Sequence, residues 1–199
     1  MNTQLIEQQV EATGPRPRSR RVHSPLRSTP VAYRQASAGD APAIHALIAG
    51  HLEEGRLLPR AIGELAIHAD RFIVAIRRSR IVGCAELAPL SGRVAEIRSL
   101  VVDGSARSLG IGRKIIEKLQ HRAQLDGFDQ LCAFAHDAAY FVRLGFSIVP
   151  HTWVPEKIAR DCTSCAQFRR CGQHALVRPV GGAAVRSNST FVPLPALRG

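Results

Sequence analysis

The sequence predicts an α/β protein in which a mixed central sheet of about six to seven strands is flanked by helices in a single domain. Runs rich in β-branched residues alternate with runs of helical period, in the order β-α-α-β-β-β-α-β-α followed by further strand candidates. The chain has 199 residues, 45% of them hydrophobic, which is enough for one well-buried core with tails.

The two ends of the chain differ in composition from its middle. Residues 1–30 are rich in proline and arginine and are expected to form a disordered basic tail, with a polyanion-binding arm as the alternative. Residues 31–180 are expected to form the domain and residues 181–199 a flexible tail. The net charge is +11, of which the two tails carry +3 and +2. The remaining charge suits an anionic small molecule, so nucleic acid is not the expected partner.

The first half of the domain is expected to contain three strands and two helices. Residues 31–36 form the first strand, and residues 62–68 form a short second helix. Residues 71–76 and 81–87 form a hairpin around a polar turn. The first helix shows one apolar stripe, made of Ala43, Ile44, Leu47 and Ile48.

The second half is organised around a strand at residues 97–102, a polar loop, and the helix that follows. Residues 128–135 form the next strand, residues 137–146 a helix, and residues 147–149 and 174–177 further strands. The helix after the loop has apolar residues on one face, namely Ile111, Ile115, Ile116, Leu119 and Ala123.

The loop before that helix carries Arg107, Gly110 and Gly112 in the pattern Arg-x-x-Gly-x-Gly. Glycines at a helix start let a ligand approach the backbone, and the N–H groups of the first turn have no partner inside the helix. With the helix dipole and Arg113 beside them, these donors suit a diphosphate. An ordinary loop–helix junction is the alternative.

This pattern resembles the pyrophosphate-binding signature of the GNAT superfamily of acetyl-CoA-dependent N-acetyltransferases. The helix candidate that ends in Gly145-Phe146 resembles the helix after the coenzyme-binding strand of that superfamily. The resemblance implies the GNAT fold, with acetyl-CoA as the co-substrate. It implies coenzyme contacts at Leu100, Val101, Val102, Arg107, Ser108, Leu109, Gly110, Ile111, Gly112 and Arg113.

Residues 51–60, 81–87 and 153–158 resemble segments of N-acetylglutamate synthases. This resemblance implies acetylation of the α-amine of L-glutamate, the first step of arginine biosynthesis, by a short form without the amino-acid-kinase-like domain of the long synthases. It implies substrate contacts at Leu58, Arg60, Arg98 and Ser99. Guanidinium groups grip carboxylates bidentately, which fits a substrate with two carboxylates. The alternative for Arg60 is a solvated loop arginine, and the alternative for Arg98 is a cross-strand ion pair with Glu86 or Glu96.

The chemistry that the resemblance implies is direct attack of the neutral amine on the thioester carbonyl. A backbone N–H near residues 100–102 would polarise the carbonyl oxygen. Glu96, acting through water, is the candidate proton acceptor, with Glu86 and His136 as alternatives.

Many superfamily members place a tyrosine four residues before the glycine of Gly-Phe, where it protonates the leaving thiolate. In this chain Phe141 stands at that position. Tyr140, one residue earlier, is expected to face elsewhere on the helix, which argues against a tyrosine acid.

Cys162, Cys165, Cys171 and His174 have the residue types and nearly the spacing of a zinc knuckle. A structural zinc ion is kept as an alternative to plain thiols, and no metal is assigned to the site. No apolar run approaches the ~18–20 residues of a membrane span, and the N-terminus shows no secretory signal, so a cytoplasmic protein with reduced cysteines is expected.

Other functions stay open at this point. The enzyme could act on another amine, such as a protein N-terminus or a different amino acid, and could be a homodimer. A non-catalytic acyl-CoA-binding or nucleic-acid-associated module is the alternative from a different class of protein.

Overall fold

The computed structural model describes residues 29–55, 57–165 and 167–181. Its sheet has seven strands in the order β1-β2-β3-β4-β5-β7-β6, and neighbours are antiparallel except for the parallel pair β4 and β5. The strands are β1 (Ala32–Gln35), β2 (Phe72–Arg77), β3 (Arg80–Pro89), β4 (Val94–Val102), β5 (Gln130–Ala135), β6 (Ser147–Val149) and β7 (His174–Pro179). The predicted fold class is confirmed. The expected tails lie outside the described residues, apart from residues 29, 30 and 181.

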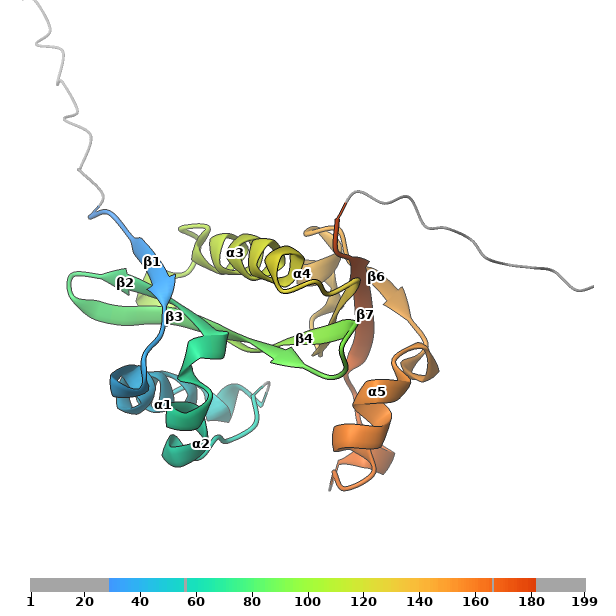
Figure 1. Ribbon diagram of the computed structural model, residues 1–199. Coiled ribbons are helices and arrows are strands. Elements are labelled where there is room, and N and C mark those ends of the chain that lie inside the picture. The colour runs from blue at the N-terminus through green and yellow to red at the C-terminus, as the bar shows by residue number, and fades with distance from the viewer. Residues whose placement is uncertain (1–28, 56, 166, 182–199) are drawn as a thin grey trace, which may run out of the picture.

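Helices cover both faces of the sheet (Figure 1). On one face lie α1 (Ala41–Ala49) and α2 (Ile62–Ile67), and on the other α3 (Ile111–Leu125) and α4 (Ala138–Val142). The short α5 (Pro155–Lys157) continues into a π-helical turn at Ile158–Cys162. Six 3₁₀ turns complete the described elements: Ala38–Asp40, Leu52–Glu54, Ala69–Arg71, Gly104–Ala106, His151–Trp153 and Phe168–Arg170.

The helix candidate at 137–146 is shorter than predicted, because α4 ends at Val142. The N–H of Gly145 bonds to the carbonyl of Val142, and Gly145 itself has φ of +86°. Glycine adopts this left-handed conformation without steric cost and commonly ends a helix there. The chain then turns into β6.

The core has two layers, one on each face of the sheet, and a one-residue bulge in β4 between Ile97 and Val101 decides which face Val101 joins. Ala95 and Ile97 on β4 pack on the α3 side with the apolar stripe of that helix. Val101, also on β4, packs on the opposite side with Ile44 and Leu65 of the two N-terminal helices. Both faces of β4 are therefore buried, which holds this strand firmly in the middle of the sheet.

Strand β1 is joined to the turn before α1 by a bidentate ion pair. Arg34 donates from Nη1 and Nη2 to the two oxygens of Asp40, at 2.7 and 2.8 Å. Asp40 also accepts from the backbone N–H of Ser37, at 2.8 Å. The hydrogen bonds from Arg34, and secondarily those from Ser37, hold the pKa of Asp40 well below its usual range.

Strand β4 contains a bulge against β3. Between the pairs Cys84↔Val101 and Glu86↔Arg98, β4 has one residue more than β3. Ser99 lies in this bulge, with a left-handed φ of +53°. Left-handed backbone is strained for serine, and bulges are common beside active sites, where they redirect side chains.

The other edge of β4 separates from β5. These two strands pair only over residues 94–96 of β4, and the last pair is Glu96↔Cys132. Beyond it, residues 97–102 have no ladder partner on that edge among the described strands. Backbone groups in this stretch can therefore bond to a ligand.

Candidate active site

A pocket of about 440 Å³ lies where β4 ends and α3 begins. Eight of the predicted coenzyme contacts line it: Leu100, Val102, Arg107, Ser108, Gly110, Ile111, Gly112 and Arg113. The remaining lining comes from Ala106, Tyr140, Arg143 and Leu144. Of the other two predicted contacts, Val101 packs in the core and Leu109 is half exposed, so both lie outside the lining. The strand alternation of β4 explains the case of Val101, because it turns toward the opposite face from Leu100 and Val102.

The loop before α3 has left-handed backbone at two positions, one of which is a glycine. Gly110, at the N-cap of α3, has φ of +72°, and Ser108 has φ of +66°. The helix that starts here, α3, is fifteen residues long, and the positive end of its dipole and its unpaired first-turn N–H groups face the pocket. The loop and helix start therefore present backbone donors of the kind that hold a phosphate.

Arg107 also lines the pocket, but it already has partners. Its Nε donates to the carbonyl oxygen of Val102 at 3.2 Å, and its Nη2 donates to Glu54 at 2.5 Å. Since 49% of its side chain is exposed, the guanidinium can still meet an anion at the pocket mouth. In this structure it ties the loop to the end of β4.

The expectation that Tyr140 faces away from the site is wrong. Tyr140 lines the pocket, and a Cβ added at Gly112 would overlap its Oη. Phe141 instead packs in the core, edge-to-face against Phe146 at 5.4 Å. Burial raises the pKa of Tyr140, while the charges of Arg113 and Arg143 oppose that rise.

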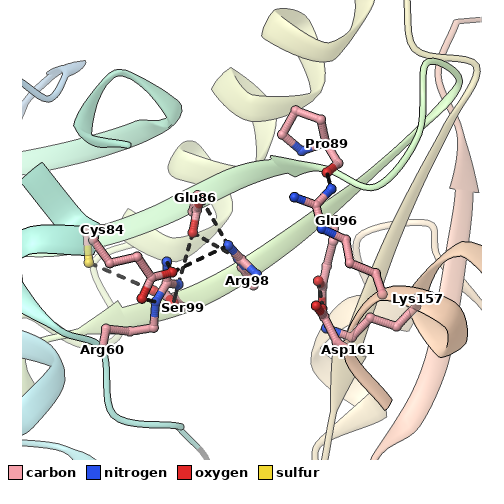
Figure 2. Close-up of polar contacts among 11 residues, drawn as sticks. Arg60, Cys84, Glu86, Pro89, Glu96, Arg98, Ser99, Lys157 and Asp161 are labelled. Atoms are coloured by element: carbon pink, nitrogen blue, oxygen red, sulfur yellow. Dashed lines mark hydrogen bonds and ion pairs between the residues drawn. The ribbon is translucent and has the colours of Figure 1, made fainter. Parts of the chain in front are cut away.

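Three of the predicted substrate residues meet on the opposite face of the sheet (Figure 2). Arg60 and Arg98 both donate to Oε2 of Glu86, from Nη1 and Nε, at 3.0 and 2.9 Å. Arg60 Nη1 also donates to Ser99 Oγ at 2.9 Å. Glu86 is fully buried, so its carboxylate depends on these two arginines for compensation of its charge.

The second edge of the Arg60 guanidinium is occupied by Glu64. Nε and Nη2 of Arg60 donate to the two oxygens of Glu64, at 3.1 and 2.7 Å. These hydrogen bonds are the main cause that lowers the pKa of Glu64. Leu58, the remaining predicted substrate residue, is 65% exposed and is not part of this cluster. The sequence placed Glu64 in the same segment as Arg60, and their i,i+4 spacing was a signal that the two could pair.

Glu96, the candidate proton acceptor, belongs to a separate group (Figure 2). It is 2% exposed and accepts a hydrogen bond from Lys157 Nζ at 2.8 Å. Lys157 in turn donates to Asp161 at 2.7 Å. Burial raises the pKa of Glu96, and the positive charge of Lys157 opposes that rise. The alternative base Glu86 is bound on both oxygens by arginine.

The cysteine-rich segment follows α5. Cys162 and Cys165 are partly exposed, and Cys171 is exposed. In the part of the chain that the structure describes, no three His, Cys, Asp or Glu side chains are grouped so that they could hold a metal ion. Equally, none of the described helices has the length and apolarity that crossing a membrane requires.

Comparison with known proteins agrees with this geometry. The acetyltransferase (GNAT) domain model matches residues 68–148. An uncharacterized N-acetyltransferase of Chlorobaculum tepidum is 32% identical over 145 residues, covering 73% of this chain and 94% of that protein. An amino-acid acetyltransferase of Neisseria meningitidis is 30% identical over 150 residues, but these cover 74% of this chain and only 34% of that enzyme.

Among solved structures, N-acetylglutamate synthase from Neisseria gonorrhoeae, complexed with coenzyme A and N-acetyl-glutamate, superposes with a TM-score of 0.69 at 29% identity. The match covers 77% of this chain and 36% of the synthase, so the chain spans about a third of that enzyme's length. Fold and pocket together define an acyltransferase that uses acetyl-CoA as its co-substrate. The chain belongs to the GNAT family of N-acetyltransferases, and it is similar to N-acetylglutamate synthases.

Proposed function

We propose that this enzyme acetylates the α-amine of L-glutamate, as in the first step of arginine biosynthesis. The observation that carries the proposal is the convergence of Arg60 and Arg98 on Glu86 beside the bulge of β4. Arg98 lies on β4, the strand that also lines the coenzyme pocket, and Arg60 reaches the same strand from the loop before α2. The similarity to enzymes described as amino-acid acetyltransferases supports the same choice of substrate.

The proposed binding mode is an exchange of carboxylates on Arg60. The side chain of Arg60 is only 9% exposed, whereas that of Glu64 is 41% exposed and able to move outward. A substrate carboxylate that took the place of Glu64 would meet the same two donors in bidentate geometry. Arg98, whose side chain is 25% exposed, would then bind the second carboxylate.

The proposed chemistry uses groups that the fold leaves available. Glu96 Oε1 accepts no hydrogen bond from the described residues, so it can hold the water that takes the proton from the amine. The unpaired edge of β4 at residues 100–102 can donate an N–H to the thioester oxygen. Amine attack then forms the amide bond while the coenzyme leaves as its thiolate. The cytoplasmic location that we infer fits five cysteines without a disulfide.

The test is thiol release from acetyl-CoA with a panel of amino acids and peptides. We expect glutamate to be the best acceptor, and glutamine to be poorer because it lacks the side-chain charge. Arg60→Ala should lower kcat/KM for glutamate about ten- to hundredfold, since a fork to a carboxylate is worth roughly 1.5–3 kcal/mol. Arg93→Ala is the matched control, because Arg93 forms an exposed pair with Asp129 and is not part of the cluster.

Because Arg60→Ala could also disturb folding, Glu64→Gln gives a second test. This change removes the charge that competes with the substrate and should lower KM for glutamate several-fold while the protein stays folded. Equal rates with glutamate and glutamine, or turnover of peptides without turnover of glutamate, would defeat the proposal.

A further inference from the structure

A second groove lies between α3 and the end of α4, with a volume of about 240 Å³. The α3 residues that line it recur at helical spacing and so share one face: Arg113, Ile116, Glu117 and Gln120. The opposite wall is formed by Arg143 and Leu144 after α4, and by Arg178 on β7. The groove is thus built by three elements that are distant in sequence.

The polar lining consists mainly of hydrogen-bond donors. In the described parts of the chain, neither Arg113 nor Arg143 forms a hydrogen bond or an ion pair through its guanidinium. Arg178 is held in place by donating to the carbonyl oxygen of Leu144. Gln120 adds a buried Nε2 that has no hydrogen-bond partner. Buried donors without acceptors are costly, so this lining favours a ligand that brings acceptor oxygens.

The charge of the groove also favours a ligand with negatively charged oxygens. Its acid, Glu117, is paired with Lys114 at 3.0 Å on the exposed surface of α3. Three arginines therefore set the sign of the potential in the groove. Guanidinium groups bind phosphate oxygens in a fork, and a phosphate monoester carries about −1.5 to −2 charges at neutral pH.

The groove is continuous with the coenzyme pocket, because Arg113, Arg143 and Leu144 line both. Coenzyme A carries its diphosphate and a phosphate monoester on the same ribose. If the diphosphate lies at the start of α3, the monoester lies one sugar ring away. We infer that this groove holds the 3′-phosphate of the coenzyme and makes the enzyme discriminate acetyl-CoA from its 3′-dephospho form. The inference rests on the proposed position of the diphosphate.

The experiment measures binding of acetyl-CoA and acetyl-3′-dephospho-CoA by calorimetry. Wild type should bind acetyl-CoA at least tenfold more tightly than the dephospho form. Arg143→Ala should weaken acetyl-CoA binding about tenfold more than it weakens binding of the dephospho form, so that the two affinities become nearly equal. Arg122→Ala is the control, since Arg122 lies on the same helix, pairs with Asp126, and is not in the groove. It should alter neither ligand.

A second variant separates failure of the diphosphate placement from failure of the inference about the 3′-phosphate. Gly112→Asp acts at the proposed diphosphate position and should weaken both ligands equally, so failure of the diphosphate placement would be seen there. Equal affinity of wild type for the two coenzymes would overturn the inference, even if inorganic phosphate binds to the groove. An Arg143→Ala protein that loses both ligands equally would also overturn it, because Arg143 would then act on the diphosphate.

Discussion

Arg60 Nη1 lies 3.0 Å from Glu86 Oε2, although the two residues are 26 positions apart and their side chains are only 9% and 0% exposed. The pair joins the loop before α2 to strand β3. A charge this deeply buried is tolerated only while it is paired. The same contact therefore supports the fold and holds the proposed substrate arginine in position.

Glu86→Gln should destabilise the protein by about 3 kcal/mol, because it leaves two arginines facing a neutral amide in a buried place. Arg60 keeps its bonds to Glu64, so the loss should lie at the lower end of the range for buried pairs. Urea unfolding followed by circular dichroism measures it. Glu117→Gln removes an exposed pair and should change stability by less than about 0.5 kcal/mol. Equal effects of the two changes would contradict the interpretation.

Gly112→Asp should raise the Kd for acetyl-CoA more than tenfold. The new side chain would meet the hydroxyl of Tyr140 and bring a negative charge to the proposed diphosphate position. Gly104→Ala is the control, because a Cβ there has no neighbour within 4 Å. Calorimetry with folded protein gives both values, and unchanged affinity in the Gly112 variant would refute the placement of the diphosphate.

The Arg34–Asp40 pair predicts a pH-dependent stability. The pKa of Asp40 is lowered in the folded state, so its contribution is present above the unfolded pKa of about 3.8 and disappears as the pH falls through the folded pKa. Arg34 is 47% exposed, so the contribution should be only about 1 kcal/mol. Asp40→Asn should therefore be less stable than wild type at pH 7, and the difference should shrink toward pH 2. A difference that grows on acidification would have the wrong sign.

The five thiols should differ in their reaction with iodoacetamide. Cys84 is buried, and burial raises its pKa to about 12, while burial likewise raises the pKa of Cys132. Cys171 is exposed. At pH 8 mass spectrometry should find Cys171 labelled first, with Cys84 and Cys132 labelled only after denaturation. Labelling of Cys84 in the folded protein at the rate of Cys171 would contradict the described burial.

Local features of the sequence determined much of this protein. The period change at Ile111 predicted α3, and the helix has the predicted apolar face buried. The pattern of Arg107, Gly110 and Gly112 predicted the loop that lines the main pocket. Such features can be predicted from sequence because they depend on residues only a few positions apart, which set the backbone conformation and the helical spacing.

Only the tertiary structure decided which distant residues come into contact with these local elements. Tyr140 lines the pocket because α4 packs with this side chain beside the start of α3, where its hydroxyl lies against Gly112, a contact that helical spacing does not reveal. Arg178 reaches the second groove because β7 inserts between β5 and β6, a strand order that periodicity does not specify. Which of several glutamates faces Arg60 depends likewise on strand register and on the bulge of β4. Contacts between distant segments are set by the packing of the whole sheet, so no local pattern encodes them.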